Sequence, residues 1–204
     1  MVQGPVDQGQ KAGVTYAYGD IDEGFGYTTY YLYTANDSSG TSYNMGKTPL
    51  YSYHIELNDK NTTTYTFYSG EMNIPKVLSG TSIFSFFSSD VGTTDNLIYT
   101  IKLYHYDGST STQIGSTWTS ETWAIGGAYR TPVAVIAKIA STTPVNFAPG
   151  DQLKLEVKAN VTDEDDNYHL FGVDPMNRDG SEITPSGGVE SSQFICLIPW
   201  KLFT

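Results

Sequence analysis

Thr143-Pro-Val-Asn-Phe-Ala-Pro-Gly-Asp-Gln-Leu-Lys-Leu-Glu-Val-Lys-Ala-Asn-Val-Thr162 is the most clearly patterned stretch of the chain. It predicts a tight turn, because Pro149 fixes φ and Gly150 accepts the positive φ that a type II turn requires next. After the turn, apolar residues alternate with polar ones, at Leu153, Leu155, Val157 and Ala159. This period of two predicts a strand with one buried and one solvated face. Phe147, just before the turn, is expected to fold over the buried face.

Other segments carry strand patterns of the same kind. Leu97 to Tyr106 alternates most regularly, and Asp107-Gly108 follows it as a hairpin turn signal. Thr131 to Ala140 fits a helix or a strand by its periodicity, but its β-branched residues favour a strand. Gln193 to Ile198 is apolar on both faces, which is typical of a central strand. About eight to ten strands with frequent turns predict an all-β fold, an antiparallel β-sandwich with little helix.

Turn residues also predict which strands pair. Tyr51 to Leu57 and Thr64 to Tyr68 flank a polar turn, so they are expected to form a hairpin. The strand that ends at Val161 is followed by an acidic tip, and Tyr168 to Val173 is expected to return beside it. Pro75 is expected to interrupt a ladder, because proline cannot donate a backbone hydrogen bond.

The length of 204 residues suits one large β domain, and no linker divides the chain. Residues 1–12 are rich in glycine and glutamine and predict a flexible N-terminal arm, which leaves residues 13–204 as a single domain. The first ten residues lack the apolar centre of a signal peptide. No apolar run approaches the roughly 18 to 20 residues that a membrane helix needs.

The chain is acidic, with a net charge of -11 and an isoelectric point near 4.5. Nucleic-acid affinity rests largely on Lys and Arg at the phosphates, so no nucleic-acid partner is expected. An acidic surface also disfavours anionic membranes, and no membrane partner is expected. The abundance of tyrosine (16 residues) and the low share of charged residues (16%) resemble exported or virion-surface β proteins.

No arrangement of residues singles out catalysis. The only cysteine, Cys196, lies in an apolar run and is interpreted as a buried, inert thiol. The three histidines, His54, His105 and His169, lie on predicted strands and are interpreted as structural or as pH-sensitive interface residues. The Gly-x-Ser-x-Gly nucleophile elbow of many hydrolases is absent. Carboxylates are numerous enough for a glycosidase pair, although no two stand out. The chain is therefore predicted not to be an enzyme.

One acidic loop is a candidate metal site. Asp163, Asp165 and Asp166 supply several carboxylate oxygens, which Ca²⁺ prefers as ligands, so a Ca²⁺ site is one interpretation of this loop. The loop lacks the spacing of an EF-hand, and a solvated hairpin tip is the other interpretation. Asp20, Asp22 and Glu23 form a second, weaker acidic turn. No other cofactor is expected.

The tyrosines between residues 30 and 53 also have two interpretations. They are suited to core and subunit-interface packing, where a large ring carries a polar tip. They are also suited to stacking against sugars. The residues concerned are Tyr30, Tyr31, Tyr33, Tyr43, Tyr51 and Tyr53.

The C-terminal part resembles a known group of proteins. The motifs are Phe147 to Leu155, Tyr168 to Arg178, and Ile198 to Phe203. Together they resemble jelly-roll structural proteins of tailed double-stranded DNA viruses. This resemblance implies a jelly-roll β-sandwich that decorates a capsid, often as a homotrimer.

The function predicted from these features is that of a non-enzymatic virion protein. It would decorate or stabilise a capsid at the virion surface, through association with copies of itself and contacts with the major capsid protein or another virion protein. The alternative is a carbohydrate-binding β-sandwich module, with or without Ca²⁺, on a cell or virion surface.

Overall fold

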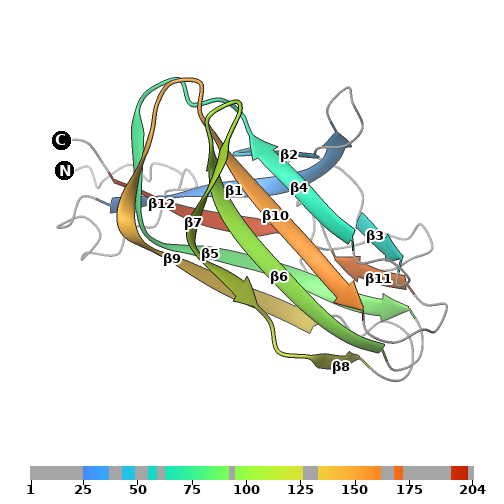
Figure 1. The fold of residues 1–204 in the computed structure, drawn as a ribbon. Coiled ribbons are helices and arrows are strands. Elements are labelled where there is room, and N and C mark those ends of the chain that lie inside the picture. The colour runs from blue at the N-terminus through green and yellow to red at the C-terminus, as the bar shows by residue number, and fades with distance from the viewer. Residues whose placement is uncertain are drawn as a thin grey trace, which may run out of the picture.

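The computed structural model describes residues 25–36, 43–48, 55–58, 63–91, 95–125, 133–161, 168–171 and 194–201. These residues form β-strands and turns, so the all-β class is confirmed (Figure 1). Among them no helix is long and apolar enough to cross a membrane. The strands are β1 (Phe25–Asn36), β2 (Tyr43–Gly46), β3 (Ile55–Asn58), β4 (Thr63–Ser69), β5 (Lys76–Val91), β6 (Asp95–Tyr106), β7 (Ser111–Thr119), β8 (Trp123–Ile125), β9 (Val133–Phe147), β10 (Gln152–Val161), β11 (Tyr168–Phe171) and β12 (Ile195–Lys201).

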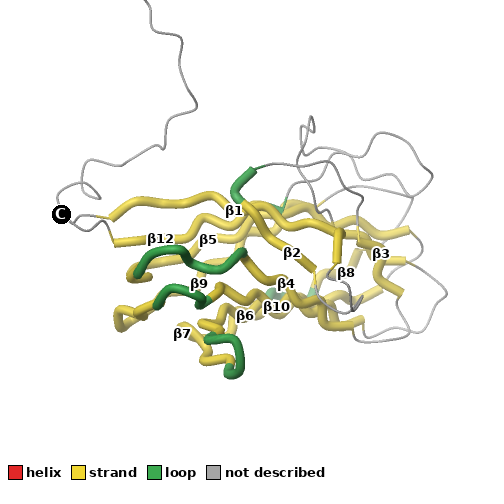
Figure 2. Tube along the Cα trace, turned by 90° about the horizontal axis from the view of Figure 1, so that it is seen from above, coloured by secondary structure: helices red, strands yellow, loops and turns green. Residues whose placement is uncertain are grey.

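The strands belong to one sheet that folds over into two layers. Its order is β3-β11-β5-β12-β1-β2-β4-β10-β6-β7, with β9 paired to β5 and β8 paired to β6. One layer contains β9, β5, β12 and β1, and the other contains β4, β10, β6 and β7 (Figure 2). All pairs are antiparallel except β2 with β4. Because β7 also lies against β9, the sheet is nearly closed. Jelly-roll connectivity within this sheet stays a prediction.

The turn predicted before β10 is confirmed. Gly150 has a φ of +95°, and the backbone N–H of Asp151 donates to the carbonyl of Ala148 at 3.1 Å. The predicted inward-facing residues of β10 are buried, while the residues between them are half-buried. Phe147 is 1% exposed and packs edge-on against Trp200, with ring centroids 5.2 Å apart. The stretch therefore supplies both layers with core residues.

Aromatic rings join the two layers. Phe86 of β5 stacks on Phe194 with centroids 4.5 Å apart and planes only 5° from parallel. On its other side it meets Tyr99 of β6 edge-on at 5.0 Å. The Tyr99 hydroxyl is buried and shares a 2.9 Å hydrogen bond with the hydroxyl of Ser88. This aromatic group lies at the centre of the core, where its rings are shielded from water.

Several local predictions hold. Asp107 and Gly108 form the turn between β6 and β7, with Gly108 at a φ of +89°. Thr131 to Ala140 falls mainly within β9, which is a strand. The new strand β5 begins directly after Pro75.

Two predicted hairpins are wrong. β3 pairs with β11, whereas β4 pairs with β10 and, in parallel, with β2. The predicted return strand after β10 is β11, but β11 pairs with β3 and β5. Both edges of β10 are already occupied, by β4 and β6. A polar turn reverses the chain, but burial of the apolar faces decides which strands become neighbours.

The last strand runs further than its proline suggests. β12 continues through Pro199 to Lys201, beyond Ile198, where the predicted strand ends. Pro199 lies opposite Tyr27 of β1, and the ladder between β12 and β5 shifts its register between Leu197 and Trp200. This irregularity accommodates a residue that has no N–H to donate. The predicted arm, residues 1–12, lies outside the described residues, so its boundary stays a prediction.

Candidate functional site

The predicted Ca²⁺ ligands, Asp163, Asp165 and Asp166, lie outside the described residues, and so does the acidic turn at residues 20–23. Within the described ranges, no three His, Cys, Asp or Glu side chains are grouped so as to hold a metal ion. The Ca²⁺ site therefore stays a prediction.

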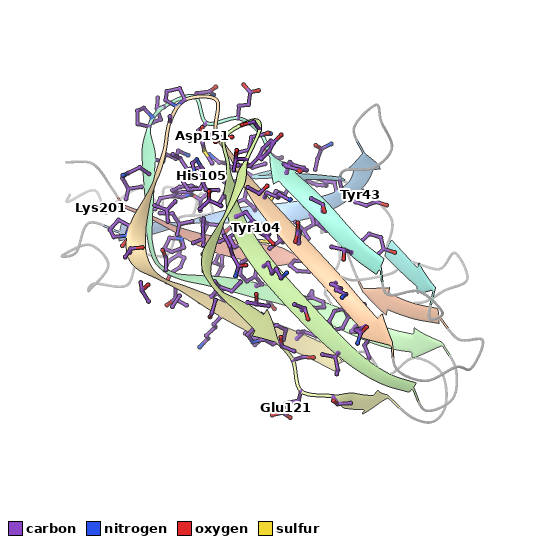
Figure 3. All side chains as sticks on the ribbon, viewed as in Figure 1. Tyr43, Tyr104, His105, Glu121, Asp151 and Lys201 are labelled. Carbon is purple, nitrogen blue, oxygen red and sulfur yellow. The ribbon has the colours of Figure 1, made fainter. Side chains whose placement is uncertain are left out.

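His105 forms a brace with the turn before β10. Its Nε2 lies 2.6 Å from Oδ2 of Asp151, and the same oxygen accepts the N–H of Ala148 at 2.7 Å. The His105 ring also meets Phe147 with centroids 4.5 Å apart. Figure 3 shows His105 and Asp151 at the same end of the molecule. The pair fixes the turn to β6, which agrees with the structural interpretation of this histidine. His54 lies outside the described residues, and for His169 only the backbone is described.

Cys196 is fully buried in β12, at the centre of one layer. Burial raises the pKa of its thiol well above the usual value, because the thiolate would lose its hydration. The thiol is therefore held in its protonated and unreactive form, as expected from its apolar sequence context.

Of the six tyrosines considered for packing or sugar stacking, most of those that the structure describes fill the core. Tyr30 and Tyr33 are 3% and 6% exposed, and Tyr43 packs against the rings of Tyr65 and Phe67. Burial raises the pKa of Tyr30 to about 12. Tyr51 and Tyr53 lie outside the described residues. Tyr30, Tyr33 and Tyr43 therefore act in packing, and a sugar-stacking surface has to be sought elsewhere.

A different group of tyrosines lies on the outer face of β4, β10 and β6. We call this group the tyrosine face: it consists of Tyr68, Tyr104, Tyr106, Lys154 and Glu156. Register brings its members together, because Lys154 of β10 lies between Tyr68 of β4 and Tyr104 of β6. Their neighbours in each strand point into the core, since side chains alternate along a strand. The face is thus a direct product of the alternation that builds the core.

The members of the tyrosine face contact one another. The ammonium of Lys154 lies 5.0 Å from the ring centroid of Tyr104 and 6.0 Å from that of Tyr68. It forms a 2.9 Å ion pair with Oε1 of Glu156, whose Oε2 accepts the hydroxyl proton of Tyr104 at 2.9 Å. Tyr68 and Tyr106 meet edge-on at 5.2 Å. The result is an ordered aromatic surface with a cation, an anion and a hydroxyl in fixed positions.

Electrostatics within the face support this order. Partial burial raises the pKa of Tyr104 to about 12, and its hydrogen bond to Glu156 and the charge of that carboxylate add to the rise. Partial burial also opposes the ionisation of Glu156. Hydrogen bonds from Lys154 and Tyr104, with the charges of Lys154 and Lys102, nevertheless hold the pKa of Glu156 below its usual value. The face therefore carries a carboxylate and a neutral phenol at neutral pH.

The lowered pKa of Glu156 predicts a change in acid stability. Because the folded state binds a proton at this group more weakly than the unfolded state, its contribution is present above the ordinary value of 4.5 and is lost as pH falls through the folded value. The Glu156→Gln variant is expected to be less stable than the parent at neutral pH, with the difference shrinking as the pH falls below 4.5. Urea unfolding at neutral pH and at acidic pH measures this.

The matched control for this experiment is Glu121→Gln, because Glu121 is an exposed carboxylate outside the face (Figure 3). The control is expected to follow the parent at both pH values. A Glu156→Gln variant whose stability runs parallel to that of the parent across this pH range would contradict the assigned interactions.

The alternation from Leu97 to Tyr106 places Tyr104 and Tyr106 on the same face of their strand, but sequence reasoning did not single them out. The missing information was strand pairing. Tyr68 and Lys154 become neighbours only through the ladder between β4 and β10, which the predicted hairpin excluded. The available signal was the occurrence of tyrosines at outward-facing positions on several strands.

Comparisons with known proteins bear on the fold. No protein-family profile matches the chain, and no curated protein matches it. A CocE/NonD family hydrolase from Staphylococcus aureus superposes with a TM-score of 0.51 at 10% identity, covering 86% of this chain and 37% of the hydrolase. An aminopeptidase from a marine sediment Thaumarchaeota archaeon gives 0.49 at 10% identity, over 87% of this chain and 37% of that one. An alpha-amino acid ester hydrolase gives 0.45 at 10% identity, over 85% and 35%.

This chain thus spans little more than a third of the length of these hydrolases. At this level of identity the likeness concerns the fold alone, and recognition as a virion protein stays a prediction. The prediction that the chain is not an enzyme is contradicted, because a hydrolase contains a fold like this one. The absence of the Gly-x-Ser-x-Gly elbow from this chain therefore does not decide whether the chain belongs to an enzyme.

Proposed function

We propose that this chain is a carbohydrate-binding β-sandwich domain that holds glycans on the tyrosine face. The observation that carries the proposal is the alignment of Tyr68, Lys154 and Tyr104 across three strands, with Tyr106 beside them. A sugar ring offers an apolar face of C–H groups, and an aromatic ring supplies a matching apolar surface with a polar tip. Binding sites that combine such surfaces with a few fixed polar groups select ligands by shape and hydrogen bonding.

The polar groups of the face suit sugar hydroxyls. Glu156 accepts hydrogen bonds, and Lys154 donates them, as shown by its contacts with Glu156 and with the hydroxyl of Ser111 at 3.3 Å. Both charges are held in place by neighbours, so little side-chain entropy remains to be lost on binding. A glycan can extend over the three neighbouring strands that carry the face. The proposal applies equally to a separate protein and to a domain within a longer hydrolase.

Glycan-array screening tests this function. The labelled chain is expected to bind at least one glycan class above background, in buffer with Ca²⁺ and in buffer with a chelator. Loss of binding with the chelator would assign a role to the acidic loop. No binding to any plant, microbial or animal glycan in either buffer would contradict the proposed function.

Substitutions then locate the binding surface. Tyr68→Ala and Tyr106→Ala are each expected to weaken binding of the best glycan about three- to tenfold in isothermal titration calorimetry, since each removes one aromatic contact. Tyr31→Ala is the matched control, because Tyr31 is a half-buried tyrosine on β1, in the other layer. Equal losses in all three variants would place the binding surface elsewhere.

A further inference from the structure

A cavity of about 500 Å³ opens beside the loop that joins β4 to β5, apart from the tyrosine face. Its size falls in the range of sites for small molecules. Residues from β1, from the end of β2 and from this loop form its walls. The lining residues that matter most for its chemistry are Tyr30, Met45, Lys47, Gly70, Met72 and Lys76.

The floor and the rim of the cavity differ in chemistry. Tyr30, Met45 and Met72 are 3%, 3% and 4% exposed, and they form an apolar floor. Lys47 and Lys76 bring two cations to the same cavity. Glu71, which is exposed, adds one carboxylate, so the lining keeps a net charge of +1 in a chain whose total charge is -11. A positively charged site on an acidic protein is suited to an anionic ligand.

The two lysines are close enough to affect each other. Burial lowers the pKa of Lys76, and the nearby ammonium of Lys47 lowers it further. Lys47 lies 5.8 Å from the ring centroid of Tyr30, and Lys76 lies 5.1 Å from that of Trp200. In the part of the chain that the structure describes, neither lysine forms an ion pair with a carboxylate. An anion between them would relieve their repulsion.

The wall of the cavity is held by backbone hydrogen bonds to the turn before β10. The N–H of Met72 donates to the carbonyl of Asp151 at 2.8 Å, and the N–H of Gly150 donates to the carbonyl of Met72 at 2.9 Å. The His105–Asp151 pair fixes that turn in its place. The cavity wall is therefore ordered before any ligand arrives, which reduces the entropy lost on binding.

We propose that this cavity binds a small organic carboxylate, with its charged group between Lys47 and Lys76 and its apolar body on Tyr30, Met45 and Met72. A free phosphate would use the cations but leave the apolar floor in contact with water. A carboxylate with a hydrocarbon or aromatic body satisfies both parts of the cavity. Lysine ammonium groups act as point charges and do not require the bidentate geometry of an arginine site.

The probe for this proposal is 3-phenylpropionate, with 3-phenylpropionamide as its uncharged analogue and inorganic phosphate as the bare anion. Calorimetric titration at low ionic strength is expected to give saturable binding of 3-phenylpropionate, and at least tenfold weaker binding of the other two. Binding of phosphate as tight as that of 3-phenylpropionate would overturn the assignment of an organic ligand. An absence of saturable binding of 3-phenylpropionate would overturn the proposal.

Four variants test the position of the ligand. Lys76→Met and Lys47→Met are each expected to weaken binding of 3-phenylpropionate at least fivefold. Gly70→Leu removes no charge; Gly70 lines the cavity, and a Cβ there would meet no atom within 4 Å, so a larger side chain can be placed at this part of the wall. It is expected to weaken binding at least tenfold. Lys138→Met, on the exposed face of β9, removes the same charge far from the cavity and is expected to leave binding unchanged.

Thermal unfolding of each variant establishes that it is folded before titration. If Lys138→Met weakened binding as much as Lys76→Met, general charge attraction would explain the binding and the proposal of a specific site would fail. If Gly70→Leu bound as tightly as the parent, the ligand would lie outside the cavity. Both outcomes concern residues outside the tyrosine face, so the glycan proposal and this one succeed or fail separately.

Discussion

Phe86→Ala is expected to lower the free energy of unfolding by about 3–5 kcal/mol, the usual loss for a phenylalanine removed from a core. The ring is fully buried and lies between Phe194 and Tyr99, which come from different layers. Its removal leaves a cavity that the two flanking rings cannot both fill without leaving their strands. Urea unfolding followed by tryptophan fluorescence measures the loss.

The control for this core substitution is Ile136→Ala. Ile136 is 60% exposed on the outer face of β9, so its truncation is expected to change stability by less than about 0.5 kcal/mol. A loss below about 1 kcal/mol for Phe86→Ala would show that the layers are not packed through this ring.

Gly115→Ala is expected to be almost as damaging, at about 2–4 kcal/mol, through the backbone rather than through a lost side chain. Gly115 lies in β7 with a φ of +66°, which alone disfavours any other residue. A Cβ there would also lie 2.4 Å from the carbonyl oxygen of Ala140 and 2.8 Å from Cγ2 of Ile139, both in β9. In the variant, β7 has to move away from β9, which opens the sheet where these two strands meet.

Gly108→Ala separates the two causes. Gly108 has a φ of +89°, but a Cβ there would meet no atom within 4 Å. It is expected to lose only the conformational part, about 1–2 kcal/mol. Urea unfolding of both variants gives the difference between them, which measures the contact of β7 with β9. Equal losses in the two variants would mean that β7 can move away from β9 without a cost in stability.

Local features of the fold were predictable from sequence, because they depend on few neighbouring residues. Pro149 and Gly150 specify their turn through φ alone, and the alternation from Leu153 to Ala159 places its strand correctly. The hairpin at Asp107-Gly108 has the same local origin.

Pairing between distant strands was not predictable in the same way. The parallel contact of β2 with β4 and the placement of β11 between β3 and β5 depend on how the whole apolar surface is covered. For this reason the candidate sites were missed as well. Lys47 and Lys76 share a cavity, and Tyr68 and Tyr104 flank Lys154, only after the sheet has closed.

The burial of Cys196 has a practical consequence for measuring motion. It is the only cysteine, and its β12 strand lies between β1 and β5 at the middle of one layer. A thiol reagent added to the native protein reaches its sulfur only when that part of the sheet opens, so the labelling rate reports the frequency of opening. The chain carries its own kinetic probe at the centre of the sheet, and no residue has to be introduced to read it.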